Sequence, residues 1–179
     1  MKPFRMNRLQ MAKTMMMALG IMVVISCNKN DNSSKDAIDR SSTGLAPETV
    51  AQLRAAKLAT QKYQSLETAK AEGYADINVV QENMGFHMRK AALVDTIFDP
   101  TKREIWVYNK NHDGTAQLVA VEYAVPIPLS PNKAPGGFAG TSDAWTYSTT
   151  FNLWLLHSWV WEYNPQGIFN PTNPLVHLH

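Results

Sequence analysis

Apolar residues recur at the spacing of one helix face between residues 47 and 72. Pro47 suits the first turn of a helix, because its ring presets the backbone angle and its missing amide hydrogen is not needed there. Gly73 suits the position just beyond the last turn. The pattern therefore predicts an amphipathic helix from Pro47 to Glu72 that lies against a sheet. Its apolar face consists of Val50, Leu53, Ala56, Tyr63 and Leu66.

After Gly73 the pattern changes to the short apolar runs that are typical of strands. Residues 103–108 (REIWVY) and 116–125 (AQLVAVEYAV) flank the polar, glycine-containing segment NKNHDG, which predicts an antiparallel hairpin. Residues 150–163 (TFNLWLLHSWVWEY) predict a last strand. We therefore expect an α+β fold, in which the N-terminal amphipathic helix packs on a small antiparallel β-sheet or partial barrel.

Prolines and glycines divide the rest of the chain. Four prolines between residues 126 and 135 are followed by two glycines, and they predict a long loop before the last strand. The C-terminal segment NPQGIFNPTNPLVHLH contains three Asn-Pro steps, which favour extended or turn-like backbone. Residues 45–179 are numerous enough for one globular domain.

Residues 1–26 have the features of a secretory signal peptide. Lys2, Arg5, Arg8 and Lys13 give it a positive start, and residues 15–25 form an apolar run. This run is shorter than the about 20 residues that cross a bilayer. The segment is therefore predicted to be a leader that is removed from the mature protein.

The residues VVISC at the end of the leader resemble the lipobox of bacterial lipoproteins, with Ser26 before the cleavage point and Cys27 as the lipidated residue. The resemblance implies that Cys27 is acylated and anchors the protein to a membrane. The expected location is the periplasmic side or the cell surface of a Gram-negative bacterium. Cys27 is also the single cysteine, so an internal disulfide is excluded. Residues 27–44 are polar and predict a lipidated, flexible tether.

Removal of the leader reverses the sign of the net charge. The full chain has 17 basic and 15 acidic residues, and four of the basic ones lie in the leader, so the mature chain has 13 basic and 15 acidic residues. The basic isoelectric point of the precursor therefore does not indicate a nucleic-acid partner. The sequence also lacks a basic stripe interleaved with aromatic residues, so nucleic acid is not expected as a partner.

Two ionisable residues lie on predicted strands at positions that should be buried. His157 shares its strand face with Leu155 and Trp159, which places an imidazole on an apolar, core-forming row. Glu122 lies in a strand with apolar residues on both faces. A lone buried carboxylate is costly unless it is protonated or meets a cation, a hydrogen-bond donor or a metal.

Three further histidines complete the candidates for metal binding. His87 follows Gly85 in the segment MGFH, and His177 and His179 form a terminal His-x-His that could chelate one ion in an extended segment. His112, in the polar hairpin loop, is expected to be exposed. Imidazoles with one carboxylate are ligands that zinc, copper and iron accept. His87, Glu122 and His157 therefore predict a transition-metal site, with His177 and His179 as candidate extra ligands.

Structural explanations compete with the metal site. His157 could be a core histidine held by a backbone carbonyl or a tyrosine, and Glu122 could form a buried ion pair with Arg89 or Arg103. The histidines at the chain end could be frayed.

Several segments together resemble a family of secreted or lipid-anchored bacterial proteins of uncharacterised function. They are MGFH, FDPTKREIWVY, LVAVEYAVP, GGFAG and LHSWVWEYNPQGIFNPTNP, and the resemblance as a whole extends over residues 71–176. The resemblance implies that His87, Glu122 and His157 occupy polar positions of the family, and it implies no activity. Many relatives in this family carry a cysteine before Met-Gly and another after the last Asn-Pro. This chain has neither, so its C-terminus must be held in another way.

Three functions fit these observations. The first is a lipid-anchored domain that binds a metal ion or small ligand through His87, Glu122 and His157. The second is a metal-dependent enzyme, in which the same residues leave one coordination position open for water. The third is a structural or interaction lipoprotein with no bound ligand. Convergence of the three side chains on one point would separate the first two from the third.

Overall fold

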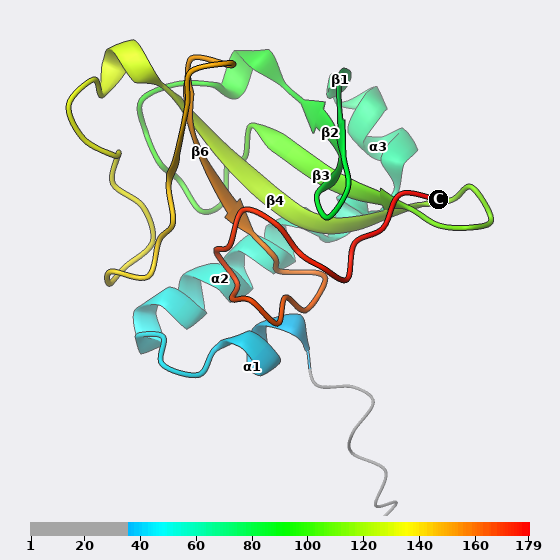
Figure 1. The fold of residues 1–179 in the computed structure, drawn as a ribbon, viewed down its shortest axis with the longest axis horizontal. Coiled ribbons are helices and arrows are strands. Elements are labelled where there is room, and N and C mark those ends of the chain that lie inside the picture. The colour runs from blue at the N-terminus through cyan, green and yellow to red at the C-terminus, as the bar shows by residue number, and fades with distance from the viewer. Residues whose placement is uncertain (1–35) are drawn as a thin grey trace, which may run out of the picture. The chain divides into compact units, whose positions relative to one another are not determined.

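Six antiparallel strands form a curled sheet in the order β1-β2-β3-β4-β6-β5 (Figure 1). The computed structural model describes residues 36–179. Helices together with this antiparallel sheet confirm the expected α+β organisation. The strands are β1 (Ala75–Gln81), β2 (Gly85–Arg89), β3 (Ile105–Lys110), β4 (Ala116–Pro126), β5 (Thr146–Ser148) and β6 (Leu153–Ser158).

The predicted helix begins at Pro47 but does not continue unbroken to Glu72. It is divided into α2 (Pro47–Thr60), the 3-10 helix η1 (Gln61–Gln64) and α3 (Leu66–Ala71). Ser65 caps α3 by accepting a hydrogen bond from the amide of Thr68. The prediction of one continuous helix is thus wrong between residues 61 and 65.

The buried side of α2 consists of Thr49, Leu53, Ala56 and Thr60, which lie three or four positions apart as one helix face requires. Short 3-10 turns also occur at Ala91–Leu93 (η2) and Ile127–Leu129 (η3). None of the helices in residues 36–179 combines the length and the apolar character that crossing a membrane requires.

The packed part of the chain begins before the predicted boundary at Leu45. Helix α1 (Ala37–Ser41) starts at Asp36, and its Ile38 side chain is only 1% exposed. Lys57 on α2 forms an ion pair with Asp36 at 2.8 Å. The prediction that the flexible tether extends to residue 44 is therefore wrong for its second half, from Asp36 onward. The predicted leader (1–26) and Cys27 lie outside the described residues.

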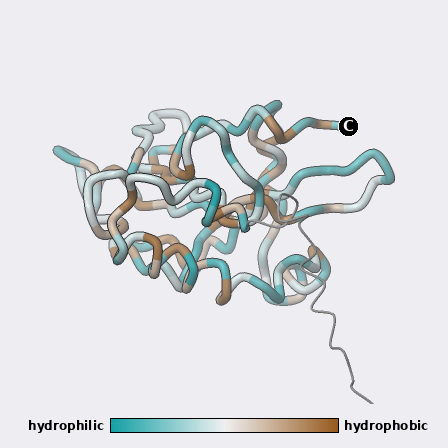
Figure 2. Tube along the Cα trace, turned by 90° about the horizontal axis from the view of Figure 1, so that it is seen from below, coloured by the Kyte–Doolittle hydropathy of each residue, from teal (hydrophilic) through white to brown (hydrophobic). Residues whose placement is uncertain are grey.

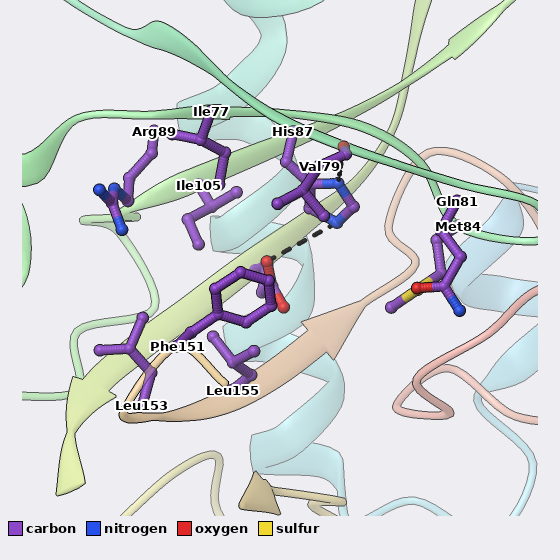
Figure 3. A pocket seen from close by; sticks show the side chains of 11 residues that line it. Ile77, Val79, Gln81, Met84, His87, Arg89, Ile105, Phe151, Leu153 and Leu155 are labelled. Atoms are coloured by element: carbon purple, nitrogen blue, oxygen red, sulfur yellow. Dashed lines mark hydrogen bonds and ion pairs between the residues drawn. The ribbon is translucent and has the colours of Figure 1, made fainter. Parts of the chain in front are cut away.

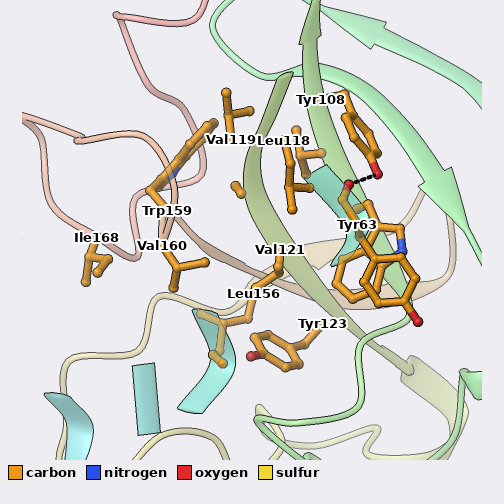
Figure 4. Close-up of a cluster of buried hydrophobic side chains, with 14 of the residues drawn as sticks. Tyr63, Tyr108, Leu118, Val119, Val121, Tyr123, Leu156, Trp159, Val160 and Ile168 are labelled. Atoms are coloured by element: carbon orange, nitrogen blue, oxygen red, sulfur yellow. Dashed lines mark hydrogen bonds between the residues drawn. The ribbon is translucent and has the colours of Figure 1, made fainter. Parts of the chain in front are cut away.

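The main core lies between the helices and one face of the sheet (Figure 4). The Tyr63 ring from η1 packs against Trp106 on β3, with centroids 4.4 Å apart. The hydroxyl of Tyr108 donates a hydrogen bond to the backbone oxygen of Tyr63 at 2.6 Å. Tyr63 therefore ties the end of the α2–η1 segment to the sheet. The turn between β3 and β4, in contrast, is hydrophilic (Figure 2).

The predicted hairpin of residues 103–125 is confirmed as β3 and β4, and every residue of β4 from Leu118 to Val125 is buried. The last strand is shorter than predicted and ends at Ser158. Beyond that point, the amide of Trp159 donates to the backbone oxygen of Ile168 at 3.0 Å instead of pairing with β4. The Trp159 indole also donates to the tail, to the backbone oxygen of Asn170, whereas the Trp161 indole donates to the hydroxyl of Thr60 on α2.

The three Asn-Pro steps of the tail form the same local turn. In each, the asparagine side-chain oxygen accepts a hydrogen bond from the amide two residues later: Asn164 from Gln166, Asn170 from Thr172, and Asn173 from Leu175. This outcome agrees with the turn-like backbone expected there.

The end of the tail is bound to the β1–β2 turn. The amide of Asn83 donates a hydrogen bond to the backbone oxygen of Val176 at 3.1 Å. The amide of Asn173 donates one to the backbone oxygen of Asn83 at 2.7 Å. Val176 is fully buried. These contacts hold the C-terminus in place without a disulfide.

Candidate metal centre

Three ionisable side chains from three strands meet on the face of the sheet opposite the helices. His87 comes from β2, Glu122 from β4 and His157 from β6. The Nε2 atom of His157 lies 3.4 Å from Oε1 of Glu122, and the Nε2 atom of His87 lies 3.9 Å from Oε2. One ligand atom of each residue lies within 4.8 Å of the others, and all three residues are buried.

Strand register explains the convergence. Glu122 is directly opposite His157 across the β4–β6 pair, so both side chains stand on one face. On its other side Glu122 is opposite Ile105 of β3, and His87 is opposite Val107 of the same strand. His87 therefore lies diagonally across β3 from Glu122. The curl of the sheet brings these side chains together over β3.

The backbone around His87 fixes the orientation of its ring. Gly85 has a φ of +100°, and a Cβ atom there would lie 2.3 Å from the backbone oxygen of Tyr108, so only glycine fits. An irregularity in β1, where Asn78 has a φ of +56°, precedes Val79. Nδ1 of His87 donates a hydrogen bond to the Val79 oxygen at 2.9 Å. Because a carbonyl can only accept, the Nε2 atom of neutral His87 carries a free lone pair that faces Glu122.

Burial keeps all three groups uncharged. Desolvation, with a smaller contribution from the Glu104 carboxyl, raises the pKa of Glu122 to about 8. Desolvation, with a contribution from His87, lowers the pKa of His157 to about 3, and burial also lowers the pKa of His87. At neutral pH the group therefore consists of one protonated carboxyl and two neutral imidazoles, and the geometrical ion pairs are not charged pairs.

One nitrogen of the group has no hydrogen-bond partner. The Nε2 atom of His157 is buried, and its approach to Glu122 does not meet the geometry of a hydrogen bond. The His157 ring is nearly parallel to the Trp159 indole, with an angle of 12° between the planes and ring centroids 5.9 Å apart. An unpaired buried nitrogen is unusual in a folded protein and calls for an explanation.

A cavity of about 90 Å³ reaches His87 and Glu122 (Figure 3). Residues of β1, β2, β3 and β4, of β6 and of the β5–β6 turn line it, so both ends of the curled sheet contribute. Most of the lining is apolar, and Arg89 and Gln81 add polar groups. The lining residues are Ile77, Val79, Gln81, Met84, His87, Arg89, Ile105, Glu122, Phe151, Leu153 and Leu155.

The terminal histidines do not join this group. Nδ1 of His177 lies 3.0 Å from Oε1 of Glu82 on the surface, and the His179 ring is stacked on His112 with centroids 3.5 Å apart. His112 is exposed, as expected. The hypothesis that His177 and His179 complete the buried site is therefore wrong, because the tail ends beside the β1–β2 turn at the surface.

Neither Arg89 nor Arg103, the two candidate ion-pair partners of Glu122, forms an ion pair with it. The guanidinium of Arg103 donates to the backbone oxygens of Ala56, Pro100 and Thr101. Arg89 lines the cavity but makes no ion pair within residues 36–179. The carboxyl of Glu122 thus has only histidines as ionisable neighbours at ion-pair distance in this part of the chain.

Two contributors to the site carry no clear signal in the sequence. Val79 acts through its backbone oxygen, which any residue type supplies. Phe151 reaches the cavity from the β5–β6 turn, although the strand pattern placed it inside the last strand. The comparison of this chain with protein-family models, curated proteins and solved structures finds no match.

Proposed function

We propose that this domain binds a transition-metal ion, with zinc, copper or iron as the candidates, through His87, Glu122 and His157. The observation that carries the proposal is the convergence of three metal-ligating groups that make no hydrogen bond to one another. Two imidazole nitrogens and a carboxyl group meet in a buried space, and the Nε2 atom of His157 has no hydrogen-bond partner in residues 36–179. A cation would satisfy all three groups at once.

The distances support a single ion. Nitrogen and oxygen ligands lie about 2.0–2.1 Å from zinc, so neighbouring ligand atoms of a tetrahedral site are about 3.3 Å apart. The His157–Glu122 distance of 3.4 Å is close to this value, and the His87–Glu122 distance of 3.9 Å requires only a small side-chain adjustment. The Val79 oxygen gives His87 the outer hydrogen bond that metal-binding histidines usually have.

A metal-dependent enzyme is the second candidate, and the cavity is the observation in its favour. Three protein ligands leave at least one coordination position free, which is the arrangement of catalytic rather than purely structural sites. The cavity reaches two of the three ligands, so a small molecule has a route to that position. A structural lipoprotein with no bound ligand is the remaining alternative, and it leaves the unpaired His157 nitrogen unexplained.

The location of the protein is part of the proposal and rests on the sequence alone. We infer export and anchoring through a lipidated Cys27, with the described domain on the periplasmic side or at the cell surface. Cys27→Ser would test this inference, because it removes the acylated thiol. The variant should leave the membrane fraction and appear as soluble protein, while an unchanged membrane association would contradict lipid anchoring.

Metal content tests the proposed site. The tag-free protein would be purified without added metal. Its metal content would then be measured by mass spectrometry and compared with that of two variants. The His87→Ala, His157→Ala double variant should lose a near-stoichiometric ion, while the control His112→Ala, an exposed histidine, should keep it. Circular dichroism would establish that the double variant is folded. A metal-free protein that also fails to bind added Zn²⁺, Cu²⁺ and Fe²⁺ would overturn the proposal.

A further inference from the structure

An arginine without an anionic partner lies at one end of the cavity beside the candidate metal centre (Figure 3). His87 and Arg89 are two positions apart on β2, so their side chains stand on the same face of the sheet. Phe86, which precedes His87, and Met88, which lies between His87 and Arg89, point to the opposite face. Arg89 is half-buried and forms no ion pair and no side-chain hydrogen bond within residues 36–179.

The rest of the cavity wall is apolar near Arg89. Ile77 from β1, Ile105 from β3 and Leu153 from β6 surround the space between Arg89 and the His87–Glu122 pair. The Phe151 side chain, from the β5–β6 turn, lies over the same space and is 45% exposed. A cavity with a few placed polar groups in an apolar wall is typical of small-molecule sites.

The charges favour an anion. Arg89 and Glu122 are the two residues of the lining that can carry a full charge besides His87, and Arg89 alone of these has no ion-pair or hydrogen-bond contact within residues 36–179. The guanidinium therefore presents free donors to a ligand in the cavity. A guanidinium binds a carboxylate through two parallel hydrogen bonds, which gives both strength and orientation.

We propose that the cavity binds a small carboxylic acid, with its carboxylate on Arg89 and its apolar body against Ile77, Ile105 and Leu153. The cavity of about 90 Å³ sets the size of the ligand, and a volume of this order holds roughly four to six non-hydrogen atoms. The end of the acid remote from Arg89 lies next to His87 and Glu122. This inference rests on the proposed function in one respect, since it takes the cavity as the route to the metal ion.

Butyrate and its uncharged isostere butyramide are the matched probes. Each would be titrated into the full-length, isotopically labelled protein, in metal-loaded and in metal-free form, and followed by the amide signals of β2 in NMR spectra. Butyrate should bind at least about tenfold more tightly than butyramide, which is the lower end expected for a charge-assisted hydrogen bond. Equal affinities for the two probes would overturn the proposal. Phosphate should bind more weakly than butyrate, because it has no apolar body, and equal binding of phosphate would contradict the role of the apolar wall.

Two variants assign the contact to Arg89. Arg89→Gln should remove the preference for butyrate, while Lys90→Gln should keep it, because the Lys90 ammonium lies near the Tyr74 ring and is not part of the cavity. If Arg89→Gln does not fold, Arg89→Lys replaces it: this variant keeps the charge without the paired donors, so it should bind butyrate more weakly than the parent protein does. An Arg89 variant with unchanged butyrate affinity would overturn the proposal.

The two proposals fail in distinguishable ways. His157→Ala removes a metal ligand that does not line the cavity and leaves Arg89 in place, so it should lose the ion and keep butyrate binding. A protein without metal that still prefers butyrate through Arg89 would retain the acid site and reject the metal site. A metal-loaded protein that binds butyrate and butyramide equally well would retain the metal site and reject the acid site.

Discussion

His157 faces Glu122 across the β4–β6 pair, with Nε2 3.4 Å from Oε1, and neither side chain has an oppositely charged partner in residues 36–179. Both residues are 3% exposed. The pair is therefore a close contact between two uncharged, polar groups inside an apolar surrounding. Such a contact contributes little by itself, and its chemistry changes when a cation enters.

Glu122→Gln should separate metal binding from folding. Glutamine has nearly the shape of the protonated carboxyl, so the free energy of unfolding of the metal-free protein at pH 6 should change by about 1 kcal/mol or less, the net size of one hydrogen bond. Metal affinity should fall by at least about 100-fold, because even the outer partners of metal ligands are worth 10- to 100-fold. Chemical denaturation and a metal titration measure the two effects. A variant that binds metal normally would exclude Glu122 as a ligand.

The stability of the metal-free protein should decrease as the pH rises from 6.5 to 8. Glu122 and Glu104 have folded-state pKa values of about 8, above their unfolded value of 4.5, so the folded protein holds more protons in this range and rising pH favours unfolding. His157, with a pKa lowered to about 3, works in the opposite direction, but only below its unfolded value of 6.5. Each carboxyl should contribute about 1–2 kcal/mol over this interval.

Urea denaturation at several pH values measures this dependence. Glu122→Gln should remove roughly half of the decrease between pH 6.5 and pH 8 and leave the half that belongs to Glu104. Below pH 4.5 the dependence of stability on pH has the opposite sign. The unfolded protein binds a proton at His157 there and the folded protein does not, so stability should fall as the pH is lowered. A parent protein whose stability is constant from pH 6.5 to pH 8 would show that the buried carboxyls are already ionised.

Metal binding should release close to one proton for each ion at pH 7. Glu122 is mostly protonated there because burial raises its pKa to about 8, and it must lose the proton to become a ligand, whereas the two histidines are already neutral. Calorimetric titrations in buffers with different ionisation enthalpies count the protons. The number should approach zero at pH 9. Release of no proton at pH 7 would mean that Glu122 does not coordinate the ion as a carboxylate.

Gly85→Ala should destabilise the fold by about 3 kcal/mol or more and abolish metal binding. The φ of +100° strains any side chain there, and the new Cβ atom would collide with the backbone oxygen of Tyr108. Gly114→Ala is the control, because Gly114 also has a positive φ, of +82°, but open space around it. The control should lose only about 1–2 kcal/mol. Thermal unfolding compares the two, and equal losses would argue against the close approach of β2 to β3.

The sequence predicts the elements of the site better than its geometry. Strand alternation indicates that His157 and Glu122 are both buried, because each lies in a row of apolar residues, and the structure agrees. That the two face each other depends on the register between strands that are more than 30 positions apart, which local patterns do not contain. The position of His87 depends further on the curl of the sheet and on the Gly85 backbone.

The errors of the sequence analysis also have physical reasons. The break in the helix between residues 61 and 65 arises because Tyr63 packs on Trp106 and Tyr74, a tertiary contact that outweighs the helical pattern. The polar appearance of residues 36–44 concealed Ile38, a single apolar side chain that buries itself beside α2. In the last strand, the aromatic run continues past Ser158, but the regular pairing with β4 ends there. The Trp159 amide donates to Ile168 of the tail, and the amides of Trp161 and Glu162 both approach the backbone oxygen of Val119 on β4.

The hydrogen bonds between Asn83 and the tail join parts of the chain that are about 90 positions apart. Residues 173–176 close the turn that leads into β2. The hairpin that carries His87 therefore reaches its final form only after the tail has docked on it. A change that loosens the tail is expected to act on the position of His87, although no tail residue belongs to the group of His87, Glu122 and His157.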